Sequence, residues 1–267
     1  MEDLIAGCCQ FRVVPGNVDE NVKRVEAAIG HFGEKGCRLL VFPEMWSCGF
    51  AYPTLKSMAD RTPGVLEKLR EWARRWGMVL VGSLPERQGD EVFNTSFVID
   101  VTGEVAGKYR KIHLFTLHDE HSHFGRGISS LVCRTAVGHL GIGICYDLRF
   151  PELARRLALD GAEILCISAL WPVGRIEHWS VLLRARAIEN QLFVIGCNGC
   201  GIEGPLQYGG ASAIVSPTGQ VLDGAEMEEK NLVGSLDLEE LRVFRRHIPC
   251  FSDRFPSAYA PGSRISE

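Results

Sequence analysis

The chain has 267 residues, of which 46% are hydrophobic and 23% are charged, a balance that is typical of a globular protein with a sizeable core. Its formal net charge is −4, so we expect neither nucleic acid nor an anionic membrane as its main partner. No apolar run approaches the roughly 18 residues of a membrane span. Residues 1–3 are acidic and the apolar run at 4–9 is too short for a signal peptide. We therefore expect a cytoplasmic protein whose ten cysteines are reduced thiols.

Strands and helices alternate in the first half of the chain. Asn17 is predicted to cap a helix whose apolar positions recur with helical spacing. Pro63 and Gly64 are predicted to begin a second helix, which Gly77 ends. A Thr-Gly turn joins the last two apolar runs of this half into a hairpin. The predicted strands are residues 4–9, 38–42, 78–83, 94–100 and 104–109.

The second half repeats the alternation and ends in a tail without a hydrophobic period. Its predicted helices are residues 152–159, 177–191 and 238–246. Its predicted strands are residues 130–134, 140–144, 163–168, 192–197, 211–216, 220–222 and 232–236. Residues 198–210 are predicted to form a glycine-rich loop, and the tail covers residues 248–267.

Two hairpins interrupt the alternation at similar places, at residues 96–109 and 212–223. This predicts two similar halves, each with a mixed sheet and helices on one face. Stacking the two sheets with their helices outside gives an α/β fold, the four-layer αββα sandwich. No Pro/Gly/Ser-rich linker divides the chain, so we expect a single domain over residues 1–267.

Three reactive side chains each follow a predicted strand. Glu44 comes after the strand at 38–42, Lys111 after the first hairpin, and Cys145 in the sharp turn between a glycine-rich strand and a helix. Side chains at sheet ends can meet in one pocket although they are distant in sequence. Taken singly, each has a simpler explanation, because strand-end charges are commonly solvated and an isolated cysteine is commonly a small buried hydrophobe.

Together these residues support acyl transfer from a carbon that is bonded to nitrogen. Cys145 would attack a carbonyl or nitrile carbon and form a thioester. Glu44 would take the thiol proton, pass it to the leaving ammonia and then activate water. Lys111 and the backbone N–H of Tyr146 would stabilise the oxyanion, where one such donor is worth about 3–4 kcal/mol.

Three motifs carry a resemblance to a known family. Phe42-Pro43-Glu44, the run KYRKIHLF that contains Lys111, and the run CYDLRFPE that begins at Cys145 are similar to the three signatures of the nitrilase superfamily of carbon–nitrogen hydrolases. The resemblance extends from residue 4 to the tail. It implies a Glu44–Lys111–Cys145 triad, the αββα fold, no cofactor, no metal and a homodimer or higher homo-oligomer. It also makes a tail that reaches a dimer interface plausible.

A second carboxylate usually accompanies this triad, and Asp119 and Glu120 are the candidates. Glu120 matches the family pattern better and would orient Lys111 and the substrate nitrogen; the alternative is a solvated loop carboxylate. Four nearby histidines, at positions 113, 118, 121 and 123, could ligate a metal, but an active-site loop is favoured. The Cys197-x-x-Cys200 pair is interpreted as chance thiols near the pocket because no helix start follows it.

The segments around Trp171 and residues 178–191 resemble the ω-amidase branch most, whose members deaminate the amides of 2-oxo acids such as 2-oxoglutaramate and 2-oxosuccinamate. Such a substrate carries a carboxylate, which needs a cation or several N–H donors. Arg149 is the candidate cation, although an ion pair with Asp147, Glu152 or another carboxylate is the equal alternative. Further candidates for lining the cavity are Phe150, Trp171 and His178.

The loop at residues 197–210 departs from the usual version of that branch. This departure bears on the choice of substrate rather than on the mechanism, so other substrates are also considered. An N-carbamoyl amino-acid amidohydrolase is the second candidate, followed by another aliphatic amidase or a nitrilase. A catalytically silent binding protein of the same fold is the candidate from a different class. It ranks low because the glutamate, the lysine and the thiol are all present.

Overall fold

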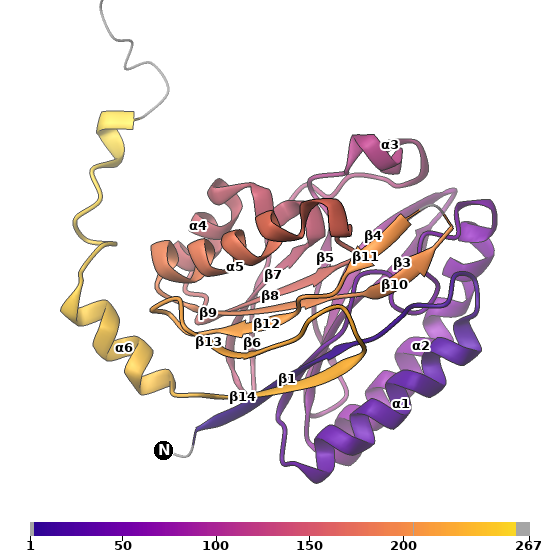
Figure 1. The fold of residues 1–267 in the computed structure, drawn as a ribbon, viewed down its shortest axis with the longest axis horizontal. Helices are drawn as coiled ribbons and strands as arrows, with labels where there is room; N and C mark the ends of the chain where they lie inside the picture. The colour runs from indigo at the N-terminus through magenta and orange to yellow at the C-terminus, as the bar shows by residue number, and fades with distance from the viewer. Residues whose placement is uncertain (1–2, 205, 260–267) are drawn as a thin grey trace, which may run out of the picture.

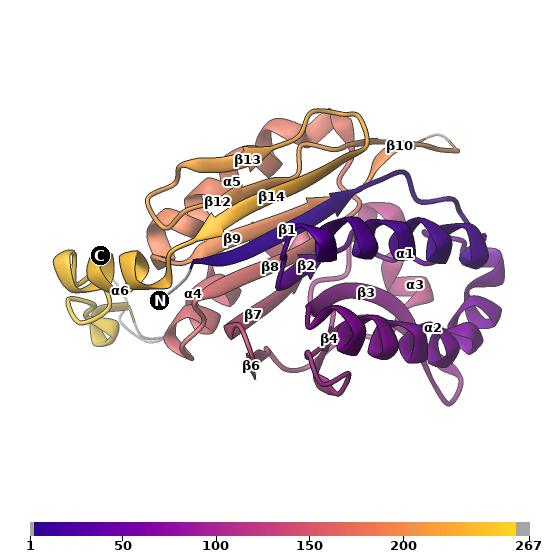
Figure 2. The same ribbon diagram turned by 90° about the horizontal axis from the view of Figure 1, so that it is seen from below.

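The computed structural model describes residues 3–204 and 206–259. Two six-stranded mixed sheets are stacked face to face, with the long helices on their outer faces (Figures 1 and 2), which is the predicted αββα arrangement. The strand order of the first sheet is β14-β1-β2-β3-β4-β5 and that of the second is β13-β12-β9-β8-β7-β6. No helix of the described residues is long and apolar enough to cross a membrane.

The first sheet consists of β1 (Leu4–Gln10), β2 (Leu39–Val41), β3 (Val79–Gln88), β4 (Glu91–Ile99), β5 (Val105–Arg110) and β14 (Lys230–Leu236). The second consists of β6 (Val132–Thr135), β7 (Gly138–Ile144), β8 (Ile164–Ala169), β9 (Phe193–Asn198), β12 (Ala213–Val215) and β13 (Val221–Gly224). The helices are α1 (Val18–Glu34), α2 (Leu55–Trp76), α3 (Glu120–His123), α4 (Pro151–Leu159), α5 (Ile176–Asn190) and α6 (Leu238–His247).

The two sheets share one topology, as the paired hairpins predicted. Each has three parallel strands in the middle, β1-β2-β3 in one and β9-β8-β7 in the other. Each continues on one side into two antiparallel strands, β4-β5 or β12-β13. One further antiparallel strand, β14 or β6, lies on the other side.

The alternation of side chains along each strand explains the layers. In β2, Leu39 and Val41 point into the core between the sheets, whereas Leu40 belongs to the cluster beneath α1 and α2. Helix α1 begins where predicted, because the Asn17 side chain accepts a hydrogen bond from the N–H of Glu20 at 3.1 Å. Helices α4 and α5 cover the outer face of the second sheet in the same way (Figure 2).

Two sequence-based boundaries were wrong. Helix α2 begins at Leu55, eight residues before Pro63, which lies inside it; the residues ahead of the proline bury Leu55 and Ala59, and this packing offsets the lost backbone hydrogen bond. Residues 198–210 are not one loop but contain a small hairpin, β10 (Cys200–Glu203) and β11 (Leu206–Gly209). Helix α2 does end at Gly77, which adopts a left-handed φ of 59°.

The carboxyl ends of β2, β5, β7 and β8 lead into one region. Strands β2 and β3 are parallel, and β5 runs in the direction of β3 because two antiparallel pairings separate them. Strand β7 is parallel to β8 in the other sheet. The fold therefore brings the segments after these strands together, as the strand-end argument requires. Helix α6 lies away from this region (Figure 1), and residues 260–267 of the predicted tail lie outside the described residues.

Candidate active site

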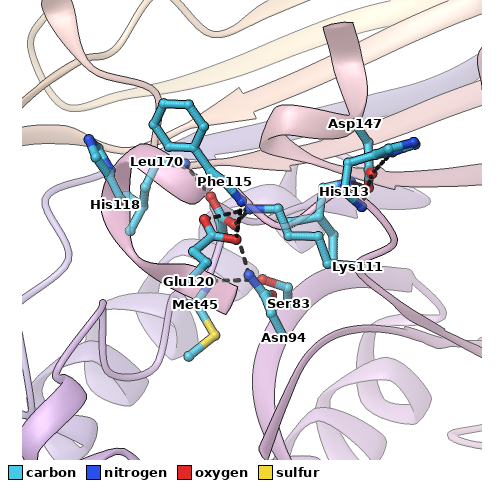
Figure 3. Close-up of polar contacts among 12 residues, drawn as sticks. Met45, Ser83, Asn94, Lys111, His113, Phe115, His118, Glu120, Asp147 and Leu170 are labelled. Atoms are coloured by element: carbon cyan, nitrogen blue, oxygen red, sulfur yellow. Dashed lines mark hydrogen bonds and ion pairs between the residues drawn. The ribbon is translucent and has the colours of Figure 1, made fainter. Parts of the chain in front are cut away.

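The buried ammonium of Lys111 joins two carboxylates. Its Nζ lies 2.8 Å from Glu44 Oε1 and 2.8 Å from Glu120 Oε1, and neither Lys111 nor Glu44 has any exposed surface. Figure 3 shows the ammonium directed at the Glu120 carboxylate. Lys111 follows β5, Glu44 follows β2 and Glu120 begins α3, so three segments distant in sequence supply one polar cluster.

Cys145 lies beside this cluster. It follows β7 and opens a short 3₁₀ helix, Cys145–Arg149, with a left-handed φ of 47°. Cys145 and Glu44 line the same pocket, and the charge of Glu44 acts on the Cys145 thiol. Burial, together with the charge of Glu44, raises the pKa of the Cys145 thiol well above its ordinary value, and Lys111 opposes this only in part. At neutral pH the Cys145 side chain is thus a protonated thiol, and it would need a neighbouring base in order to react as a nucleophile.

The charges around Lys111 fix its protonation. Burial disfavours the ammonium, but the carboxylates of Glu120 and Glu44 hold the pKa of Lys111 well above its ordinary value. The pKa of Glu120 is raised by burial and by the charge of Glu44, against the opposing effect of Lys111. Lys111 is therefore a permanent cation at neutral pH, suited to an oxyanion and unsuited to act as a base.

The carboxylate of Glu44 is held by groups that the sequence analysis did not single out. Asn94 Nδ2 donates to Glu44 Oε1 at 2.8 Å, and the N–H of Leu170 donates to Oε2 at 3.0 Å. The next residue, Met45, donates its N–H to Ser83 Oγ at 2.7 Å. Three polar residues in a row, beginning at Asn94, interrupt the apolar strand β4, and all three are fully buried. This run is the sequence signal that could have identified Asn94, because buried polar groups need hydrogen-bond partners.

A pocket opens beside the thiol, and the empty space in it, open mouth included, is about 330 Å³. Four of the predicted residues outside the triad line it, namely Glu120, Tyr146, Arg149 and Trp171. His118, from the loop predicted to belong to the active site, also lines it, and the lining residues that were not predicted are Phe50, Phe115, Leu170, Pro172 and Arg175.

The pocket contains two guanidinium groups. Arg149 lies over the Trp171 ring, 4.6 Å from its centroid, and Arg175 lies 5.4 Å from the centroid of Phe115. Arg149 is not ion-paired with Asp147 or Glu152, and no carboxylate of the described residues lies within 4.0 Å of either guanidinium. Burial and the neighbouring charge of Arg175 lower the pKa of Arg149 from its ordinary value. The pocket therefore presents positive charge that the described residues leave unneutralised.

Two predicted lining residues lie elsewhere. Phe150 stacks on the His113 ring with a centroid distance of 3.6 Å. His178 is exposed and its Nδ1 lies 3.3 Å from an Arg149 nitrogen. Neither is among the described residues that line the pocket. Phe150 therefore supports the turn after Cys145 from outside, and His178 contacts the pocket only through Arg149.

The histidines of the loop do not converge. His118 lines the pocket, His113 contacts Asp147, and His121 and His123 lie 3.6 and 3.7 Å from Asp119. Within residues 3–204 and 206–259, no group of three histidine, cysteine or acidic side chains could hold a metal ion. All ten cysteines are free, including the Cys197-x-x-Cys200 pair, and Cys250 is the exposed one.

Comparison with known proteins extends the likeness over almost the whole chain. A family model described as carbon-nitrogen hydrolase matches residues 5–246. The chain is 38% identical to the 2-oxoglutaramate amidase of Bacillus subtilis (strain 168) over 249 residues, which cover 92% of this chain and 95% of that protein.

Solved structures show the same fold. The carbon-nitrogen hydrolase of Helicobacter pylori G27 gives a TM-score of 0.90 at 26% identity, over 96% of this chain and 97% of that one. A mutant of the amidase from Nesterenkonia sp. AN1, in which acrylamide has added to the active-site cysteine, gives a TM-score of 0.83 at 29% identity. That match covers 92% of this chain and 98% of the amidase.

Proposed function

This chain belongs to the carbon–nitrogen hydrolase family and is a hydrolase with an active-site cysteine, and we propose that it is an ω-amidase acting on the amides of 2-oxo acids. The reaction hydrolyses the terminal amide of 2-oxoglutaramate or 2-oxosuccinamate to a carboxylate and releases ammonia. The observation that carries the proposal is the pair of unneutralised guanidiniums, Arg149 and Arg175, in the same pocket as Cys145. The 38% identity to a 2-oxoglutaramate amidase supports it.

In the proposed first step, Cys145 Sγ attacks the amide carbon while Glu44 takes the thiol proton. Glu44 lines the same pocket as Cys145 and its charge acts on the thiol, which supports Glu44 as the base that takes this proton. The C–N bond then breaks, Glu44 returns the proton to the departing nitrogen, and ammonia leaves a thioester on Cys145. Water, deprotonated by Glu44, attacks the thioester and releases the acid and the thiol.

Lys111 stabilises the negative charge that develops on the substrate oxygen in both steps. Its Nζ donates to Glu44 and Glu120 at rest, so the cation is in position before substrate binds and little reorganisation is needed. The backbone N–H of Tyr146, which follows the nucleophile, is the second proposed oxyanion donor. Glu120 orients the lysine and faces the pocket, where it can accept a hydrogen bond from the substrate amide nitrogen.

The charge of the pocket favours an amide with an anionic far end. Glu44 and Glu120 are already occupied by Lys111, so Arg149 and Arg175 face the pocket without a carboxylate partner among the described side chains. A guanidinium binds a carboxylate through charge-assisted hydrogen bonds of about 1.5–3 kcal/mol each. A neutral amide would leave both cations partly desolvated and unpaired.

Ammonia release from purified protein tests the proposal. We expect 2-oxosuccinamate and 2-oxoglutaramate to be hydrolysed with a higher kcat/KM than succinamate, butyramide, nitriles or N-carbamoyl-β-alanine, and Cys145→Ala to abolish turnover. If N-carbamoyl-β-alanine were instead the best substrate and released carbon dioxide together with ammonia, the enzyme would be an N-carbamoyl amino-acid amidohydrolase. Turnover by Cys145→Ala would refute the thioester mechanism.

We further propose that the chain acts as a homodimer or higher homo-oligomer. Helices α4 and α5 expose the large apolar residues Leu159, Val181 and Ile188 on the outside of the sandwich, with exposed fractions of 42%, 62% and 48%. We expect sedimentation equilibrium of the full chain to give at least twice the 29.5 kDa mass of one chain. A concentration-independent mass of one chain would overturn this proposal.

A further inference from the structure

One buried carboxylate connects the segments that carry the lysine and the nucleophile. Asp147, which is 2% exposed, accepts from the N–H of Ile144 at 2.8 Å through its Oδ2. The same oxygen accepts from the Tyr109 hydroxyl at 2.8 Å. Its Oδ1 lies 3.2 Å from the N–H and 2.7 Å from Nδ1 of His113, a contact that Figure 3 shows.

These partners flank the two reactive residues. Tyr109 and His113 lie two positions before and two positions after Lys111, and Ile144 lies directly before Cys145. Strand β5, which leads to Lys111, belongs to the first sheet, and β7, which leads to Cys145, belongs to the second. The Asp147 carboxylate thus ties a strand end of one sheet to a strand end of the other.

The turn that Asp147 holds is also a strained one. Cys145 has a left-handed φ of 47°, a conformation that is unfavourable for a non-glycine residue and persists only where its surroundings enforce it. The bond from Ile144 N–H to Asp147 closes the turn around Cys145. Tyr109 and His113 hold the same carboxylate from the other sheet.

We propose that Asp147 is a positioning residue that fixes the Cys145 sulfur relative to the Lys111 ammonium, through its bonds to Ile144, Tyr109 and His113. The proposal rests on the proposed function, since it takes Cys145 as the nucleophile and Lys111 as the oxyanion donor. A displacement of about 1 Å between reacting groups costs on the order of a hundredfold in rate. Asp147 does not line the pocket, so it acts through these neighbours and leaves substrate binding to other residues.

Asp147→Asn tests the inference, measured with the amide that the wild-type enzyme hydrolyses fastest. In the variant, an amide NH₂ group replaces one oxygen of the Asp147 carboxylate. This NH₂ group then faces one of the hydrogen-bond donors that the carboxylate had accepted from. All variants carry Cys250→Ser, because Cys250 is the exposed thiol and would react with the labelling reagent. Protein that iodoacetamide alkylates at Cys145 while the other buried cysteines stay unlabelled, quantified by mass spectrometry, counts the folded sites. We expect kcat per titrated site to fall about 10- to 100-fold with KM within about twofold of wild type.

The matched control is Asp100→Asn. Asp100 also bridges two segments, through the N–H groups of Val101 and Ala136 at 2.8 and 3.1 Å, but far from the site in sequence and fold. It should leave kcat per titrated site unchanged even if it lowers the melting temperature. The same result for Asp147→Asn would overturn the inference and reduce Asp147 to a structural role.

Tyr109→Phe keeps the inference testable if Asp147→Asn does not fold. It removes one of the four bonds and leaves the carboxylate bonded to Ile144 and His113, so we expect kcat per titrated site to fall about 3- to 10-fold with KM unchanged. Unchanged kcat in Tyr109→Phe would then overturn the inference. Full turnover by Cys145→Ala is a separate result, because it would refute the proposed function whatever Asp147 does.

Discussion

Glu120 Oε1 lies 2.8 Å from Lys111 Nζ, and the other oxygen of Glu120 accepts the N–H of Phe115 at 3.1 Å. The carboxylate is thus held by the loop that leads to it while it contacts the lysine. With Glu44 it offsets the burial of the ammonium, since a single buried charge without a partner would be neutralised. The second carboxylate therefore maintains the charge of Lys111.

We predict that Glu120→Gln moves the alkaline limb of the kcat profile to lower pH. Lys111 must be protonated to stabilise the oxyanion, and its pKa is held well above the ordinary value partly by Glu120. Removing that charge lowers the pKa of Lys111, so activity is lost at a lower pH than in wild type. Asp119→Asn, which neutralises the exposed neighbouring carboxylate, should leave the limb in place. An identical pH–rate profile for Glu120→Gln would contradict the assignment.

We also predict that Asn94→Ala lowers kcat about tenfold with KM within about twofold of wild type. The Asn94 amide donates to the Glu44 oxygen that also accepts from Lys111, so its loss frees the base to turn away from the thiol. Ser96→Ala is the control, because Ser96 is equally buried on the same strand and its hydroxyl has no hydrogen-bond partner. A larger effect on KM than on kcat would place Asn94 in substrate binding instead.

A third prediction concerns stability and pH. Although partly desolvated, Glu86 bonds to Arg110 and Lys108, which lower its pKa from 4.5 to about 2. The folded pKa is depressed, so the stabilisation is present above pH 4.5 and is lost as the pH falls toward 2. We expect Glu86→Gln to lower the free energy of unfolding by about 1–2 kcal/mol at pH 7, after allowing for the exposure of Lys108.

Urea unfolding at pH 7, 4 and 3 measures this difference. The gap between wild type and Glu86→Gln should narrow as the pH falls, and Glu91→Gln at the exposed start of β4 should show no such trend. A gap that stays constant down to pH 3 would show that the charge of Glu86 contributes nothing. The ion pairs of Glu86 with Lys108 and Arg110 lie on the edge strand β5, directly before Lys111. The activity of Glu86→Gln therefore reports whether they also hold the site in place.

The layers and the positions of most strands were predictable because they follow from local chemistry, although the strand predicted at 78–83 extends to Gln88 as β3. The apolar run of β2 and the glycine-rich run of β7 identified strands, and the polar residues after them marked the sheet ends. That Glu44, Lys111 and Cys145 would meet was argued from strand ends and from three motifs. The packing that buries Leu55 and Ala59 was not visible in the sequence, so Pro63 was misread as a helix start.

The lining of the pocket was harder to predict because it depends on how loops fold back. Arg175 lies in the segment after β8 and was passed over as a loop residue, although it faces the pocket with Arg149. Phe150 follows the nucleophile closely in sequence but turns away to stack on His113. Of the two substrate-binding candidates close to Cys145 in sequence, Arg149 therefore lines the pocket and Phe150 does not.

Arg175 provides the fourth prediction, which concerns substrate charge. Succinamate and butyramide have the same length, but the first ends in a carboxylate and the second in a methyl group. If Arg175 pairs with the substrate carboxylate, Arg175→Gln should raise KM for succinamate about 10- to 100-fold, because a charge-assisted hydrogen bond is worth about 1.5–3 kcal/mol. Its KM for butyramide should stay within about twofold. Arg134→Gln, which removes one exposed positive charge from β6, is the control for a change in net charge alone. An equal rise in KM for both amides would show that Arg175 shapes the pocket rather than recognising the anion. An unchanged KM for both would leave Arg149 as the pocket cation that binds the substrate carboxylate.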